Sequence, residues 1–260
     1  MKDNQAILMD ELWERVESLL PKPPVCPQGG RPRASDRECF EGIIWVLRSG
    51  ARWRDLPSHF PSAPTCWRRH RDWTEAGVWE TVWGLVPAEL DEFGILKPDE
   101  LFLDATFVPA KKGEEIGKTK RGKGIKVELV IDGAGTPLAA LSAAANVAEV
   151  DLAEPVLEEI PLPLAKPVPV VADKGYDSDP LRERLAEKGF DLISPHRGNR
   201  QRPKTVDGRK LRRYRRRWLI ERSNGWLQNF RRVVTRWEYY SFIYHGFVQL
   251  ACALIALSRF

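Results

Sequence analysis

The first part of the chain has apolar residues every three or four positions, the spacing that places them on one face of an α-helix. Leu12, Val16 and Leu19 follow this spacing, and Pro21 ends the segment. A loop rich in proline and glycine follows. Ser35 then begins a capping box ahead of further apolar residues. The pattern predicts four helices, at residues 9–20, 35–50, 65–77 and 78–93, with the loop at residues 21–34.

Beyond residues 94–100 the period changes to that of β-strands, with apolar runs separated by turn residues. The turn at residues 132–135 joins two of these runs, and the run that begins at residue 168 is apolar almost throughout. The pattern therefore predicts an α/β fold, a mixed sheet covered by helices. We expect strands at residues 101–110, 125–132, 136–143, 168–176 and 190–195, and helices at residues 151–160 and 178–190.

This change of pattern predicts two domains, a small all-α domain at residues 1–96 and a larger one at residues 97–260. The second and third predicted helices are joined by a turn, and the third carries Arg68, Arg69 and Arg71. Such a pair is typical of a helix-turn-helix, whose second helix enters the major groove of DNA. A plain helical bundle with exposed arginines fits the same pattern.

Positive charge is concentrated in one segment. Residues 197–236 hold 15 Lys and Arg against two acids, a net charge of +13, while the rest of the chain holds 26 bases and 34 acids, a net charge of −8. Tryptophan and tyrosine are interleaved with these bases. Nucleic acid is the partner that such a segment favours, because each neutralised phosphate releases counterions and aromatic rings stack on bases.

Several classes of protein do not fit the sequence. The apolar stretch at residues 242–257 is too short to cross a membrane and predicts a buried core helix. No apolar segment follows a basic start, so we expect a cytoplasmic protein. His59, Cys66 and His70 lack a fourth ligand for zinc. All four cysteines, which include Cys26, are expected to be reduced thiols, because none forms a CxxC pair.

Three acids are candidates for chemistry. Asp104 lies inside the first predicted strand, and Asp173 follows the nearly continuous apolar run. A carboxylate in such a place needs a partner, for example a metal ion. Glu221 is the only acid between Arg209 and Arg236, on a predicted basic helix. Three carboxylates without His or Cys favour Mg²⁺ or Mn²⁺, and two such ions can drive phosphodiester cleavage and strand transfer.

Three sequence blocks carry a family resemblance. LFLDATFV, VVADKGYDS and YRRRWLIERSNGWLQNFRRVVTRWEYY resemble the catalytic blocks of bacterial insertion-sequence DDE transposases of the insertion-sequence-five type. LWERVESLLP and GRPRASDRECFEGIIWVLRSGARWRDLP resemble that family's helical DNA-binding region. The acids Asp104, Asp173 and Glu221 are 69 and 48 positions apart, in the expected order.

The resemblance implies an RNase H-like fold, with Asp104, Asp173 and Glu221 as catalytic residues and ligands of two Mg²⁺ or Mn²⁺ ions. Asp177 is a weaker alternative to Asp173. In the related motif a Tyr, an Arg, the Glu and a Lys share a helical stripe, which corresponds here to Tyr214, Arg217, Glu221 and position 228, where this chain has Gln. Arg231 or Arg232 could replace that lysine. We expect contacts with DNA from Arg68, Arg69, Arg71, Lys120, Arg121, Lys123, Lys174, Arg213, Tyr214, Arg217, Trp218, Arg222, Trp226, Gln228, Arg231 and Arg232.

The expected function is that of a transposase that binds the terminal inverted repeats of its element, cleaves the element ends and joins them to target DNA. Because two ends must be held together, we expect a homodimer in the synaptic complex. We expect it in the bacterial cytoplasm, at the nucleoid when bound to DNA, and without a membrane partner. Two alternatives remain at this point: a non-catalytic or domesticated DNA-binding regulator, and an RNase H-like nuclease without strand transfer.

Overall fold

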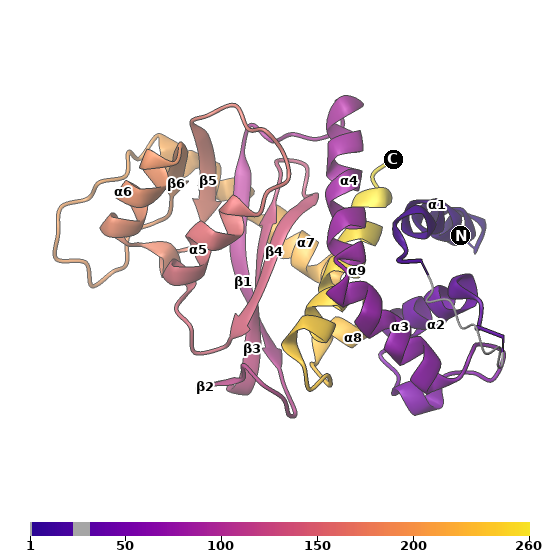
Figure 1. Ribbon diagram of the computed structural model, residues 1–260. Coiled ribbons are helices and arrows are strands. Elements are labelled where there is room, and N and C mark those ends of the chain that lie inside the picture. The colour runs from indigo at the N-terminus through magenta and orange to yellow at the C-terminus, as the bar shows by residue number, and fades with distance from the viewer. Residues whose placement is uncertain (1, 23–31) are drawn as a thin grey trace.

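A computed structural model of the chain describes residues 2–22 and 32–260. Most of the predicted loop at residues 21–34, with Cys26, lies outside the described residues. Four helices come first, in agreement with the pattern (Figure 1). They are α1 (Lys2–Leu19), α2 (Asp36–Ser49), α3 (Ala63–Glu75) and α4 (Val78–Glu92), with the 3-10 turn η1 (Trp53–Asp55) between α2 and α3.

The predicted boundaries of α2 follow from local chemistry. Ser35 caps the helix, with its hydroxyl accepting a hydrogen bond of 3.3 Å from the amide of Glu38. Gly50 ends the helix in the left-handed region, at φ 69°, where glycine carries no steric penalty. A side chain at position 50 would also collide with Arg231. The same glycine therefore lets the segment around Arg231 approach the end of α2.

A mixed sheet follows, as predicted, with six strands where the pattern gave five. The strands are β1 (Leu101–Pro109), β2 (Gly117–Thr119), β3 (Gly122–Ile131), β4 (Pro137–Ala144), β5 (Val168–Ala172) and β6 (Phe190–Ile193). The strand order is β2-β3-β1-β5-β6, with β4 also paired to β3. β1 runs antiparallel to β3 and parallel to β5. The pattern missed the short β2 and extended the strand that begins at residue 168 beyond Ala172, where β5 ends.

The remaining helical elements are α5 (Glu149–Glu158), η2 (Lys174–Tyr176), α6 (Asp179–Glu187), η3 (Lys210–Arg216), α7 (Trp218–Gln228), α8 (Arg231–Val234) and α9 (Ser241–Leu257). Helices cover both faces of the sheet, α5 and α6 on one face and α7 and α9 on the other (Figure 1). The arginine-rich segment is not one continuous helix as expected, because the 3-10 segment η3 precedes α7.

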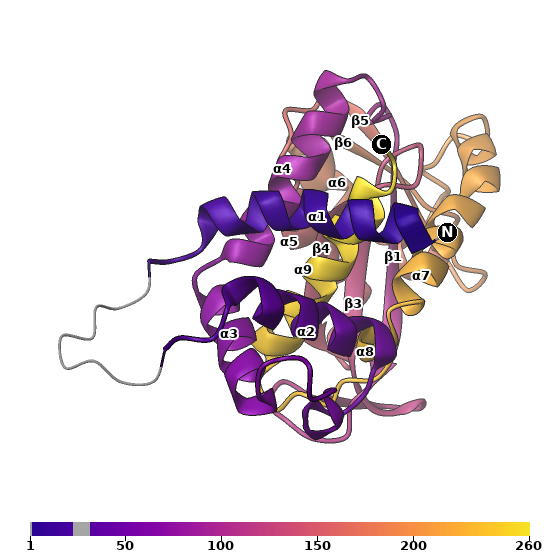
Figure 2. The same cartoon turned by 90° about the vertical axis from the view of Figure 1, so that its right-hand side faces the viewer.

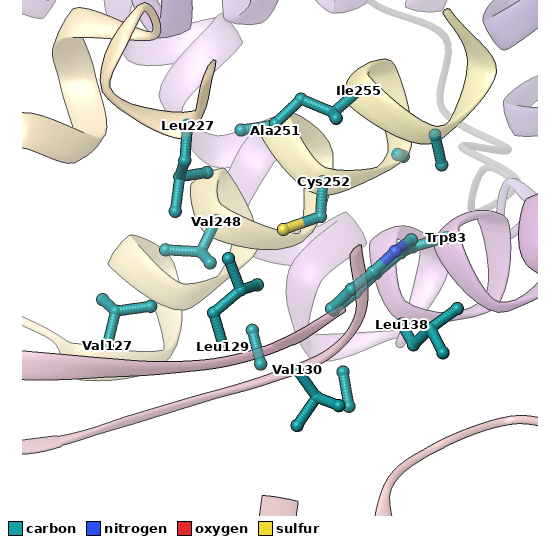
Figure 3. Packing of buried hydrophobic residues seen from close by; sticks show 14 of the residues in the cluster. Trp83, Val127, Leu129, Val130, Leu138, Leu227, Val248, Ala251, Cys252 and Ile255 are labelled. Atoms are coloured by element: carbon teal, nitrogen blue, oxygen red, sulfur yellow. The ribbon is translucent and has the colours of Figure 1, made fainter. Parts of the chain in front are cut away.

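Helix α9 is the predicted core helix, and it lies between the sheet and the N-terminal helices (Figures 1 and 2). Val248 and Cys252 face Val127 and Leu129 of β3 (Figure 3). One cluster of buried apolar residues extends from Leu12 to Leu257. Packing is therefore continuous across the predicted domain boundary, and the division into residues 1–96 and 97–260 stays a prediction. No helix in the described ranges is both long and apolar enough to cross a bilayer.

His70 helps to join these helices. It is buried, its Nδ1 accepts a hydrogen bond of 3.2 Å from the indole of Trp79, and its Nε2 lies 3.0 Å from the carbonyl oxygen of Ile243. Burial lowers the pKa of His70 to about 3, so the ring is neutral. Both ring nitrogens are used within the core, which explains this histidine without a metal.

Candidate active site

Asp104 and Asp173 line one crevice, with a volume of about 750 Å³, where the sheet opens. β5 pairs with β1 only as far as Leu103 and Ala172, while β1 continues to Pro109. From Asp104 to Val108, the edge of β1 on that side has no partner strand in the described part of the chain, and Arg236 pairs with the backbone beyond it, at Ala110. The end of β5 therefore creates the crevice and places Asp173 at its edge, close to Asp104.

The structure orients both carboxylates. Arg217 donates a hydrogen bond of 2.7 Å to Oδ1 of Asp104, and the amide of Asn224 donates one of 3.2 Å to Oδ2. Oδ1 of Asp173 accepts a hydrogen bond of 2.5 Å from the backbone amide of Gly175. The amide of Asn224 is a contact that sequence reasoning missed. Asn224 reaches Asp104 only because α7 packs against β1.

Burial and neighbouring charges change the pKa of Asp104. Its side chain is 18% exposed, and burial raises its pKa to about 6, with Arg217 opposing the shift and the negative charges of Asp173 and Glu149 adding to it. Carboxylates that crowd one another in this way favour a bound cation. Oxygen ligands without sulfur or imidazole fit the divalent ions Mg²⁺ and Mn²⁺. The residues at the crevice therefore suit such an ion.

Glu221, the third predicted acid, lies on α7 but does not line this crevice. It is exposed. Arg217 and Asn224, the two residues that bond to Asp104, are each about one helical turn from it along the chain. Gln228, a further turn along, does line the crevice. In the described ranges no three His, Cys, Asp or Glu side chains are already gathered around a metal position.

The predicted stripe of four residues is divided between two elements. Tyr214 belongs to η3, whereas Glu221 and Gln228 belong to α7. Arg217 lies between the two elements, at the N-cap position of α7, and its guanidinium lies 5.9 Å from the ring of Tyr214. The four side chains therefore do not share a single helical face, although Arg217 and Gln228 both line the crevice.

Asp177, the alternative to Asp173, is fully engaged elsewhere. Its side chain is 2% exposed and accepts hydrogen bonds from Arg182 at 2.8 Å and from His196 at 2.9 Å. The backbone amide of Arg197 donates a third bond, of 2.8 Å. Burial alone would raise the pKa of Asp177, but these donors outweigh it and hold the pKa at about 2. This carboxylate holds the segment after β6 in place and does not line the crevice.

Some of the predicted DNA contacts surround the crevice. Lys120 and Arg121, in the turn between β2 and β3, line it and are exposed. Lys123 and Lys174 are also exposed. Arg213 forms an ion pair of 2.7 Å with Glu100, and it keeps about half of its side chain accessible. Lys120 and Arg121 therefore give the crevice a positive border, whereas Lys123, Lys174 and Arg213 do not line it.

Trp218, Arg222 and Trp226 form a stack along α7. The guanidinium of Arg222 lies 4.9 Å from the ring of Trp218 and 4.5 Å from that of Trp226. Arg259 lies over Trp226 as well, at 5.4 Å. Trp218 is 53% exposed, whereas Trp226 is more deeply buried.

The remaining arginines differ in accessibility. Arg68 and Arg231 are exposed, whereas Arg69 pairs with Asp36 at 2.7 Å and Arg71 with Asp72 at 2.6 Å. Arg232 does not fit the expected contact with DNA. It is buried, its guanidinium pairs with Glu238, and it also donates a hydrogen bond of 2.9 Å to the carbonyl oxygen of Ala51. Its charge is needed inside the fold, which a count of bases along the chain cannot reveal.

Glu149 is an acid of the crevice that sequence reasoning missed. It begins α5, and it lines the crevice with Asp104 and Asp173. Lys126, on β3, lies 3.4 Å from its Oε1 and also borders the crevice. The sequence holds no local signal for this position, because Glu149 reaches the site only through the packing of α5 on the sheet.

Comparisons with known proteins agree with this arrangement. Residues 8–83 match the family model described as a putative transposase of the IS4/5 family, and residues 96–256 match the transposase DDE domain. A putative transposase for insertion sequence element IS402 of Burkholderia cepacia is 37% identical over 139 residues, covering 51% of this chain and 62% of that protein. An uncharacterized 16.2 kDa protein of the same element is 40% identical over 118 residues, covering 44% of this chain and 80% of that protein.

A solved structure shows the same fold. The piggyBac transposase, in a synaptic complex with hairpin DNA, matches with a TM-score of 0.53 over 97% of this chain and 72% of that one, at 11% identity. The predicted RNase H-like sheet preceded by a helical region is thereby confirmed. The transposase DDE domain alone accounts for more than half of the sequence. The chain therefore belongs to the insertion-sequence DDE transposase family.

Proposed function

We propose that this transposase cuts DNA at the ends of its own insertion sequence and joins those ends to target DNA. The observation that carries the proposal is the crevice at the end of β5, which Asp104 and Asp173 line together with the basic border of Lys120 and Arg121. Carboxylates beside a basic border suit a phosphodiester, because the bases hold the backbone while the acids hold cations. Membership of the DDE family supports this assignment.

Asp104, Asp173 and Glu221 would hold two divalent ions, Mg²⁺ or Mn²⁺. When bound, such ions activate the attacking water or 3′-hydroxyl and stabilise the leaving oxygen. Glu221 completes the set from α7, which is joined to Asp104 by Arg217 and Asn224 on either side of it in the sequence. Arg217 holds Asp104 in position and places a positive charge at the crevice, where it can oppose the charge of a phosphate.

The DNA partner is double-stranded, as terminal inverted repeats and as target. Lys120, Arg121, Lys123 and Lys174 contact the backbone near the crevice, with Arg213 and Arg222 along the arginine-rich segment. Trp218 stacks on a base that leaves the helix. Arg68 lies on α3, the second helix of the helix-turn-helix-like pair, and extends the contact to the N-terminal helices. Two copies hold the two element ends in one synaptic complex, in the bacterial cytoplasm at the nucleoid.

A strand-cleavage and joining assay tests the proposal. The substrate is DNA that carries the two regions flanking the gene, with Mg²⁺ or Mn²⁺, and wild type is compared with Glu221→Gln. We expect metal-dependent cutting at 3′ ends and joining, both lost in the variant. DNA affinity should stay within about tenfold of wild type, because the variant alters the chemistry and not the border.

The other outcomes identify the alternatives. Cutting without joining by the wild type would indicate an RNase H-like nuclease. Tight DNA binding with no cutting by either protein would indicate a regulator. Cutting by Glu221→Gln at the wild-type rate would remove Glu221 from the proposed metal site.

A further inference from the structure

Glu149 is carried to the crevice by α5, an element that holds none of the three predicted acids. It is the first residue of α5, close after the end of β4, whereas Asp104 and Asp173 come from β1 and from the end of β5. α5 packs on β3 and β4 and contacts η2, the turn next to Asp173. Three separate elements therefore each bring one carboxylate to the same crevice.

The two oxygens of Glu149 have different surroundings. Oε1 lies 3.4 Å from Nζ of Lys126, which also donates a hydrogen bond of 2.9 Å to the carbonyl oxygen of Val147. Lys126 thus ties the side chain of Glu149 to the backbone that precedes α5. Because this pairing engages one oxygen only, it fixes the direction of the other.

Oε2 of Glu149 and Oδ1 of Asp173 both lie against Gly175. A side-chain carbon at position 175 would come closer than 3.0 Å to both oxygens. Gly175 is the residue that leaves room for both. Two negatively charged oxygens that are both neighbours of one glycine repel each other, and a divalent ion bound by both carboxylates offsets such repulsion.

The effect of Glu149 on the pKa of Asp104 agrees with its position in the crevice. The charge of Glu149 contributes to the raised pKa of Asp104, together with that of Asp173. A salt bridge with Lys126 alone would contribute little to stability, and it would leave the position of the second oxygen, beside Gly175, unexplained.

We propose that Glu149 is a fourth metal-ligating carboxylate of the site, with Lys126 as its positioning residue. This inference rests on the proposed function, because it assumes that Asp104 and Asp173 bind a divalent ion. It adds an acid from α5 to the acids that the family resemblance supplies. An ion held near Asp173 would then have a ligand on the face of the sheet opposite α7.

Mn²⁺ binding to the full-length protein tests the inference without relying on activity. Free Mn²⁺ is followed by electron paramagnetic resonance for wild type, Glu149→Gln, Asp104→Asn and the matched control Asp151→Asn. Asp151 lies in the same first turn of α5 and is exposed, so the control removes the same charge from the same helix end. We expect Glu149→Gln to weaken Mn²⁺ binding by about tenfold or more. The control should stay within about twofold of wild type.

The outcomes distinguish a failure of the role of Glu149 from a failure of the proposed function. Wild-type affinity in Glu149→Gln, with binding lost in Asp104→Asn, would overturn the role of Glu149 and leave the proposed function standing. Wild-type affinity in Asp104→Asn as well, or no Mn²⁺ binding by the wild type, would overturn both. Equal weakening in Glu149→Gln and Asp151→Asn would mean that only helix-end charge matters, and it would also overturn the role of Glu149.

Two further measurements exclude a folding defect as the cause. Thermal melting in EDTA should give Glu149→Gln a midpoint close to that of Asp151→Asn, because the fold does not depend on this ligand. Lys126→Met keeps the carboxylate but removes its positioning partner, and we expect it to weaken Mn²⁺ binding by a smaller factor than Glu149→Gln. Wild-type Mn²⁺ affinity in Lys126→Met would remove the positioning role from Lys126.

Discussion

Replacing Asp177 with asparagine should destabilise the protein in a way that depends on pH. The hydrogen bonds to Asp177 hold its pKa at about 2 in the folded state, against 3.8 for the ordinary group. A depressed carboxyl pKa stabilises the fold above the ordinary value, and that stability is lost as the pH falls through the folded value. The shift corresponds to about 2 kcal/mol at pH 7 and to about 1 kcal/mol at pH 3.

Urea denaturation followed by tryptophan fluorescence measures this difference. Asp177→Asn keeps the shape of the side chain but removes the charge that Arg182 and Arg200 face, at 2.8 and 3.3 Å. The free energy of unfolding should fall by about 2 kcal/mol at pH 7, and the gap from wild type should shrink by about half at pH 3. A gap of the same size at both pH values, or no gap at pH 7, would refute this electrostatic explanation.

Three further variants test the site and its surroundings. Gly175→Ala should weaken Mn²⁺ binding by about tenfold with an unchanged circular dichroism spectrum, because the new methyl group collides with oxygens of Asp173 and Glu149; unchanged affinity would contradict the placement of these oxygens. Arg232→Gln leaves Glu238 buried and unpaired, so urea denaturation should show a loss of about 3–5 kcal/mol, and a loss below about 1 kcal/mol would show that the pair contributes little. Lys120→Ala combined with Arg121→Ala should reduce the slope of log affinity for DNA against log salt by about two, measured by fluorescence anisotropy; an unchanged slope would remove these residues from the DNA surface.

Local sequence signals predicted most of the elements. The capping box at Ser35 and the glycine at position 50 set the limits of α2, because both act through backbone groups within a few residues. The apolar run ahead of Asp173 and the apolar residues around Asp104 likewise predicted two strands, which the sheet places side by side. These signals work because helix caps and strand alternation depend on neighbours in the sequence.

Other features depend on contacts that are distant in the sequence. Glu149 reaches the crevice only because α5 packs on β3 and β4. The 3-10 form of η3 accompanies ion pairs from Arg213 and Arg216 to the buried Glu100, more than a hundred positions earlier. Arg232 has the same charge as its exposed neighbour Arg231, yet it is buried against Glu238. No local pattern of charge or hydrophobicity distinguishes these cases.

Whether DNA is cut in the crevice between Asp104 and Asp173 is tested most directly by the rate of Mg²⁺-dependent cleavage of element-end DNA. Asp104→Asn and Asp173→Asn are compared with Asp99→Asn, an exposed acid just before β1 that does not line the crevice. DNA affinity is measured in parallel in EDTA. We expect both crevice variants to lose cleavage while they still bind DNA within about tenfold of wild type, and the control to cut normally. Cleavage at the wild-type rate by either crevice variant would show that its carboxylate does not perform the reaction.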